Sequence, residues 1–264
     1  MEITAIIAYI LALLVGISLG LMGSGGSILT VPILVYVLGI DAVTATGYSL
    51  FIVGFTALAG GLRSIRSKNV AFDMVAVFGL PSMVAAYFTR AFIIPALPDP
   101  VINTGDWTLS KSVSLLILFA FVMLTAALKM IKPKPVTTNS HPSNIRLVIS
   151  GLGVGILAGA VGAGGGFLII PALVLMTRLP MQKAVGTSLI IIAIQSLAGF
   201  FGATSDIQPD WNLLLAFTLA SIVGIVIGMR TARQISGEKL KKGFGWFVLA
   251  MGLYILIREV YALG

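Results

Sequence analysis

The chain lacks cysteine, has a single histidine, and carries few charged residues. Without cysteine it has no disulfide, no thiolate metal site and no cysteine nucleophile, although this says nothing about redox compartment. The one histidine, His141, stands in a hydrophilic stretch, where a solvated loop residue is expected. No paired carboxylates fall inside an apolar segment. We therefore expect no enzyme active site, no metal and no cofactor within the apolar segments.

Long apolar runs dominate the sequence. Hydrophobic residues make up 58% of the chain and charged residues 10%, and apolar stretches of about 20 residues, the length of a membrane-spanning helix, recur throughout. The runs are continuous and do not alternate, which favours helices over a barrel. The net charge of +8 comes from basic residues in short loops, which is typical of membrane flanks and does not indicate nucleic acid. The sequence predicts an all-α integral membrane protein in a lipid bilayer.

An internal duplication organises the chain. Residues 16–50 return without a gap as residues 155–189, and fourteen of these 35 positions are identical. Between the copies lies a hydrophilic linker, residues 131–145, whose three prolines prevent helix continuation. The domains expected are a first transmembrane repeat at 1–130, here called the first half, and a second at 146–264, the second half.

Each half contains a glycine-rich interruption. Residues 23–26 and 162–166 break apolar segments, because each glycine weakens a helix by about 1 kcal/mol relative to alanine. Short helices should follow at 27–39 and 167–178, with a kink at Pro32. We expect each half to be a glycine-broken helical hairpin followed by three spanning helices. The expected long helices are 3–22, 43–62, 72–95 and 110–130, then 146–161, 183–203, 211–232 and 243–261.

Loop charges predict that the two halves are inverted in the membrane. The loop at 63–69 has three basic residues and no acid, whereas its counterpart near 202–210 has two aspartates and no base. The loop at 96–110 is acidic, while its counterpart at 235–249 begins with a lysine cluster. Because lysine and arginine favour the cytoplasmic side, matching loops should face opposite sides. Both termini should be external and the linker cytoplasmic.

Inverted repeats with broken helices are typical of secondary transporters. A helix that begins inside the membrane presents free N–H groups and a positive dipole end, which attract anions. We therefore expect a small anionic substrate where the two breaks face each other near the membrane midplane. The candidate ligands are Gly23, Ser24, Gly25, Gly26, Ser27, Gly162, Gly164, Gly165 and Gly166. The alternative is a tight turn without a ligand, and the more widely spaced Gly16, Gly20, Gly151, Gly155 and Gly159 fit helix packing better.

Further polar residues are candidate ligands for the anion. Each has an alternative role: hydroxyls also cap helices or bond to preceding carbonyls, and an arginine near a span end also extends to the headgroups. These candidates are Thr46, Ser49, Arg90, Thr187, Ser188 and Gln195.

The motifs GLMGSGGSILTVPIL and GAVGAGGGFLIIPAL, followed by ATGYSL and AVGTSL, resemble the TauE/SafE family of membrane anion permeases, also called sulfite exporters. The resemblance implies a multi-pass permease of the bacterial plasma membrane that moves sulfite, organosulfonates or similar small anions. An anion channel with a glycine-lined pore is the alternative. A coupling proton is left open as a partner, since Asp41 and Asp73 stand at helix ends and no carboxylate lies deep in a span.

Overall fold

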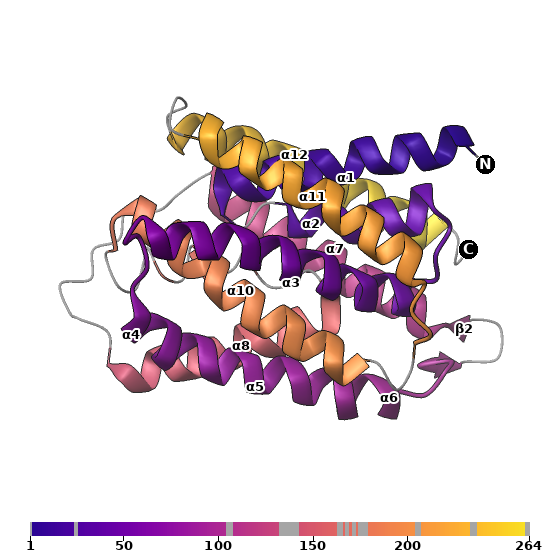
Figure 1. Ribbon diagram of the computed structural model, residues 1–264. Coiled ribbons are helices and arrows are strands. Elements are labelled where there is room, and N and C mark those ends of the chain that lie inside the picture. The colour runs from indigo at the N-terminus through magenta and orange to yellow at the C-terminus, as the bar shows by residue number, and fades with distance from the viewer. Residues whose placement is uncertain are drawn as a thin grey trace.

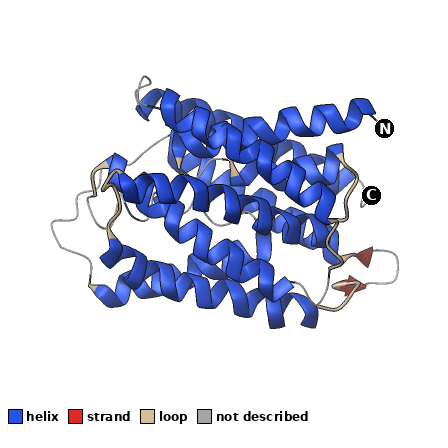
Figure 2. Cartoon of the chain, viewed as in Figure 1, coloured by secondary structure: helices blue, strands red, loops and turns tan. Residues whose placement is uncertain are grey.

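The computed structural model is a bundle of helices (Figures 1 and 2). It describes residues 2–23, 26–103, 108–131, 143–162, 166, 169–170, 173, 179–203, 207–232 and 237–261. Six helices in these ranges are long and apolar enough to cross a membrane. A short antiparallel pair of strands, β1 (Ile102–Asn103) and β2 (Thr108–Leu109), lies at one end of the bundle (Figure 1). The prediction of an all-α membrane protein is confirmed at this level.

The helix bounds follow the apolar runs of the sequence. The first half contains α1 (Glu2–Met22), α2 (Ser27–Pro32), α3 (Ala42–Arg66), α4 (Phe72–Met74), α5 (Leu80–Phe88), α6 (Ile94–Ala96) and α7 (Lys111–Ile131). The second half contains α8 (Asn144–Val161), α10 (Met181–Ala203), α11 (Trp211–Thr231) and α12 (Gly237–Tyr261). Three π-helical segments interrupt the described part of the first half: η1 (Ile33–Val37), η2 (Val75–Gly79) and η3 (Thr89–Ile93). At Pro32, where the sequence predicts a kink, the winding changes from α to π.

Aspartates fix the starts of two long helices. Asp41 accepts hydrogen bonds from the backbone N–H groups of Val43 and Thr44, at 3.0 and 3.2 Å, and so caps α3. Asp210 caps α11 by accepting a 3.1 Å hydrogen bond from the N–H of Leu213. A carboxylate at this position satisfies free N–H groups and opposes the positive end of the helix dipole. Both helices therefore begin at a defined residue, and both begin at the same end of the bundle (Figure 1).

Helices α3 and α10, here called the inner pair, form the centre of the bundle. Their most apolar windows are 72% and 67% buried, against 39–44% for the other four candidate spans. The two helices run antiparallel. Gly54 of α3 packs against Leu197 of α10, whereas Gly60, which comes later on α3, packs near Leu189, which comes earlier than Leu197 on α10. The two helices occupy matching positions in the sequence repeat, so equivalent helices point in opposite directions along the bundle.

Glycines bring the outer helices into close contact. A side chain at Gly16 of α1 would overlap the carbonyl oxygen of Ser221 in α11, and one at Gly155 of α8 would overlap that of Ser82 in α5. Gly16 and Gly155 are matching positions, and so are Ser82 and Ser221, because both pairs are 139 residues apart. The packing role predicted for these glycines is confirmed. Each half thus packs its first helix against a helix of the other half: α1 contacts α11, and α8 contacts α5.

The chain turns back on itself after α1. Gly26 lies against Val15 and Leu19, so α2 begins beside the last turns of α1. Further along, Ile33 belongs to the same buried apolar cluster as Ala12 and Val15. Later residues of the segment 27–37, here called the returning segment, thus lie beside earlier residues of α1. The segment 27–37 therefore runs antiparallel to α1 and forms a hairpin with it.

Both ends of the described chain lie at the same end of the bundle (Figure 1). The strands β1 and β2 lie at that end too, whereas α4, which follows the basic loop 63–69, lies at the opposite end (Figure 1). The bundle therefore has one end with the termini and another with this basic loop.

Candidate functional site

Each glycine-rich break begins with a glycine in a left-handed conformation. Gly23 ends α1 with a φ of 70°, and Gly162 ends α8 with a φ of 72°. Side-chain-bearing residues rarely adopt this conformation, which explains why both positions hold glycine. Gly26 and Gly166 are buried. The predicted ligands Ser24, Gly25, Gly164 and Gly165, and the side chain of Ser27, lie outside the residues that the structure describes.

Each break packs against the inner-pair helix of the other half. A Cβ atom at Gly23 would lie 2.6 Å from Cγ1 of Val185, in the first turns of α10. A Cβ atom at Gly162 would lie 2.5 Å from Cα of Thr46, in the first turns of α3. Thr46 and Val185 are matching positions of the repeat. The structure thus brings each break to the start of a helix that carries predicted site residues.

The expectation that the two breaks face each other near the midplane is wrong. The second break lies at Thr46, whereas the first lies at Val185, whose neighbour Gly186 packs against Ser64. Thr46 and Ser64 are 64 − 46 = 18 residues apart on α3, which is about 27 Å of helix. The breaks therefore lie at opposite ends of the inner pair, because the helices that carry them are nearly full-length. No single small anion reaches both.

Arg90 is buried at the second break. Its side chain is 1% exposed, and its Nη2 donates hydrogen bonds to the carbonyl oxygen of Val43, at 3.2 Å, and to the hydroxyl oxygen of Thr46. It belongs to the π-helical segment η3, a type of irregularity that is frequent at functional sites. The alternative in which Arg90 extends to the headgroups is thus wrong. The guanidinium group is instead held inside the bundle against the start of α3.

At the first break the predicted hydroxyls bond to the protein itself. The Oγ atom of Ser188 lies 3.1 Å from the carbonyl oxygen of Gly23 and 2.8 Å from that of Val185. Thr187 accepts a 2.9 Å hydrogen bond from the backbone N–H of Ala71. Both hydroxyls therefore join separate segments of the chain.

At the second break the two predicted hydroxyl groups, those of Thr46 and Ser49, differ from each other. Thr46 donates a 2.7 Å hydrogen bond to the carbonyl oxygen of Val43 while it accepts one from Arg90. Ser49, one helical turn later, is fully buried, and its hydroxyl has no hydrogen-bond partner in the part of the chain that is described. A buried hydroxyl without a partner is uncommon in folded proteins.

Gln195 lies at neither break. Its Oε1 accepts a hydrogen bond from the hydroxyl of Ser82 in α5, and both side chains are fully buried. Gln195 stands ten residues after Val185 on α10, or about 15 Å along the helix. It therefore occupies a position between the two breaks, and Ser82 is a polar neighbour that the sequence did not single out.

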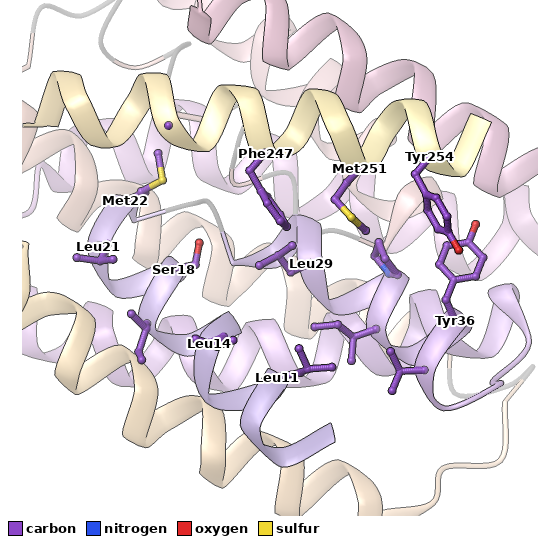
Figure 3. A pocket seen from close by; sticks show the side chains of 15 residues that line it. Leu11, Leu14, Ser18, Leu21, Met22, Leu29, Tyr36, Phe247, Met251 and Tyr254 are labelled. Atoms are coloured by element: carbon purple, nitrogen blue, oxygen red, sulfur yellow. The ribbon is translucent and has the colours of Figure 1, made fainter. Parts of the chain in front are cut away.

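An apolar groove of about 820 Å³ opens between α1, the returning segment and α12 (Figure 3). Its only hydroxyl-bearing lining residues are Ser18, Tyr36 and Tyr254, and none of its fifteen lining residues is charged. An anion entering it would lose its hydration for very few donors, which is unfavourable. The groove is therefore not a candidate anion site.

A second polar cluster lies at one end of this groove. Tyr36 donates a 2.9 Å hydrogen bond to Oε1 of Glu259, and the guanidinium carbon of Arg258 lies 4.2 Å from the centre of the Tyr36 ring. The tip of the Tyr36 side chain lies close to Tyr254 in Figure 3. Sequence reasoning missed the cluster, because 223 residues separate Tyr36 from Glu259 and neither stands in a motif.

Comparison with known proteins identifies the family. Residues 8–255 match the family described as sulfite exporter TauE/SafE. A "probable membrane transporter protein" of Xylella fastidiosa (strain 9a5c) is 30% identical over 255 residues, which cover 93% of this chain and 92% of the relative. The "probable membrane transporter protein YunE" of Bacillus subtilis (strain 168) is 24% identical, covering 97% of this chain and 99% of the relative. No solved structure matches. The chain therefore belongs to the sulfite exporter TauE/SafE family.

Proposed function

We propose that this protein is a secondary transporter for small oxyanions of the sulfite or organosulfonate type. The family description names sulfite export, and the relatives bear the name of membrane transporters. The observation that carries the proposal is the buried guanidinium of Arg90 beside the second break. A buried charge in a membrane span is costly and usually functional. Its planar N–H donors fit two oxygens of an oxyanion.

We infer that the two halves form an inverted repeat. Two observations support this: the equivalent helices α3 and α10 run antiparallel, and the contacts of α1 with α11 and of α8 with α5 are the same contact with the halves exchanged. A two-fold axis perpendicular to the bundle relates such an arrangement. If the bundle axis lies along the membrane normal, that axis lies in the membrane plane, as in many secondary transporters.

The expected orientation places the basic loop 63–69 in the cytoplasm of a bacterial cell. Both described chain ends lie at the other end of the bundle (Figure 1), which supports external termini. Reporters fused at Met1 and Gly264 should read external, and one within residues 131–145 should read cytoplasmic. Termini that read cytoplasmic would overturn this orientation.

The inner pair offers a path between the two breaks. Arg90 stands near one end of it, and the Gln195–Ser82 pair lies about midway. Neutral amide and hydroxyl groups bind an anion weakly enough to release it, which suits an intermediate position. Movement of one half against the other would open each end in turn. A coupling proton carried by the substrate itself is compatible with this path.

Proteoliposomes containing the purified full chain test the proposal. Uptake of radiolabelled sulfite should saturate and should fall when unlabelled sulfite or methanesulfonate is in excess. Uptake no faster than in protein-free liposomes, for every sulfur oxyanion and carboxylate tried, would overturn it. Unitary conductance steps in planar bilayers would instead indicate an anion channel with a glycine-lined pore.

A further inference from the structure

The two breaks are built from matching residues that do different things. The 139-residue offset pairs Gly23 with Gly162, Val185 with Thr46, Ser188 with Ser49, and Met229 with Arg90. Because the repeat places these residues equivalently, each break serves as an internal control for the other. A polar group that is satisfied at one break and unsatisfied at the other marks a difference in function.

At the first break, the neighbouring hydroxyl group bonds to the protein itself. Ser188 lies within hydrogen-bonding distance of the carbonyl oxygens of Gly23 and Val185. The position that corresponds to Arg90 is Met229, which packs against a buried apolar cluster. At the first break, therefore, Ser188 has no hydroxyl group available for a ligand, and Met229 has no positive charge.

At the second break, the matching hydroxyl group is that of Ser49. Ser49 is as fully buried as Ser188, yet its Oγ has no hydrogen-bond partner among the described residues. It lies one turn after Thr46 on α3, so the two side chains lie on the same side of the helix, and Thr46 is bonded to Arg90. An unsatisfied buried hydroxyl one turn from a residue that binds a guanidinium indicates a place where a ligand oxygen binds.

We propose that Arg90 and Ser49 form an oxyanion subsite at the second break, and that the first break is its closed structural counterpart. The inference rests on the proposed transport of anions. Thr46 holds the guanidinium group of Arg90 in place, and this group donates N–H hydrogen bonds to two oxygens of the anion. The hydroxyl of Ser49 donates to a third oxygen. The subsite thus prefers anions with three oxygens on one centre, such as sulfite and sulfonates, over carboxylates with two.

The subsite makes the transporter asymmetric. Its two breaks lie at opposite ends of the inner pair, and the anion binds tightly at the end that carries Arg90. Both halves contain the glycine break and its packing, but of the two matching positions only Arg90 carries a charge, because the other is Met229.

The test compares Ser49→Ala with its matched control Ser188→Ala in the purified full chain. Titration with sulfite, methanesulfonate and acetate gives the affinities, and thermal unfolding without ligand gives the stability. Ser49→Ala should weaken the binding of sulfite and methanesulfonate about 10-fold or more, as for the loss of one hydrogen bond to a charged group. It should leave the binding of acetate nearly unchanged and should not lower the ligand-free Tm, since the lost hydroxyl has no hydrogen-bond partner among the described residues. Ser188→Ala should keep the affinities and lower the Tm.

The outcomes separate this inference from the proposed function. If the unmodified chain binds none of the three anions, the proposed function fails and the subsite fails with it. If the unmodified chain binds sulfite but Ser49→Ala binds it equally well, or Ser188→Ala weakens it as much, only the subsite is overturned. Should Ser49→Ala not fold, Ser49→Cys takes its place with the same expectation, because a thiol is a weak donor of similar size.

Discussion

The first and second halves of the chain pack in the same way, but their breaks differ in chemistry. Gly16 of the first half packs against the backbone of Ser221 in the second half, just as Gly155 of the second half packs against the backbone of Ser82 in the first. At the breaks, by contrast, the buried Arg90 corresponds to Met229.

The difference shows which positions the duplicated framework constrains. At Gly16 and Gly155 the glycine touches the backbone of a neighbouring helix, so any side chain would force two helices apart, and both copies keep glycine. Where a side chain reaches from η3 toward the start of α3, its chemistry can change without moving a helix axis. The two halves therefore keep a common packing scheme while only one of them carries the buried guanidinium.

The largest expected effect is on the shared packing. Gly155→Val should destabilise the protein by about 3 kcal/mol or more, because the added atoms overlap the backbone of Ser82, which cannot yield. Gly16→Val should behave alike. Gly153→Val in the same helix is the control, since a Cβ atom at Gly153 meets nothing within 4 Å. The measurement is thermal unfolding in detergent, and equal stability of the Gly155 and Gly153 variants would contradict the exchanged contacts.

The next effect sharpens the difference at the breaks. Arg90→Gln should lower sulfite transport roughly 10- to 100-fold, the range for losing hydrogen bonds to a charged group. Arg90→Lys should also transport poorly, because an ammonium lacks the planar fork of donors. Met229→Gln changes the matching position and should transport normally. Normal transport by a folded Arg90→Gln variant would leave Arg90 a structural role only.

Alanine at the two left-handed glycines should separate the breaks more finely. Gly23→Ala and Gly162→Ala should each cost about 1–2 kcal/mol from the positive φ alone. Gly162→Ala should cost more, since its Cβ meets the backbone of Thr46, whereas that of Gly23 meets the side chain of Val185. Adding Val185→Ala should therefore rescue part of the loss in Gly23→Ala. Thermal midpoints measure both effects, and an equal loss at both positions would argue against the difference.

The smallest effect concerns a hydrogen bond between the halves for which the repeat supplies no second hydroxyl donor. Tyr36→Phe removes the hydrogen bond to Glu259 and should lower stability by about 1 kcal/mol. The matching residue in the second half, Leu175, has no hydroxyl to donate. Tyr254→Phe, on the neighbouring exposed aromatic ring, is the control and should leave the Tm unchanged. A Tm that falls equally in both variants would show that ring packing matters more than this hydrogen bond.

The sequence alone determined the class of the protein and the positions of its helices. Apolar runs of membrane-spanning length predict the described helices closely, and the span predicted at 211–232 is α11 (Trp211–Thr231). These properties follow from local composition, since backbone groups in lipid must bond within the same helix. The repeat and its glycines were equally visible, because identical residues at a fixed offset need no knowledge of the fold. The residues Arg90, Thr46 and Ser49 were recognised as candidates by type, but their grouping was not.

The tertiary structure decided which candidates meet. Arg90 and Thr46 are 44 residues apart, and only the packing of η3 against the start of α3 brings them into hydrogen-bonding distance. The packing of α1 and α8 against the inner pair separates the two breaks by about 27 Å along α3, although sequence symmetry suggested that they face each other. Symmetry in a sequence relates positions but gives no distance between them, because that distance depends on where the symmetry axis crosses the helices. The register of α3 against α10, with Gly54 beside Leu197, sets where that axis lies, and long-range side-chain packing alone determines it.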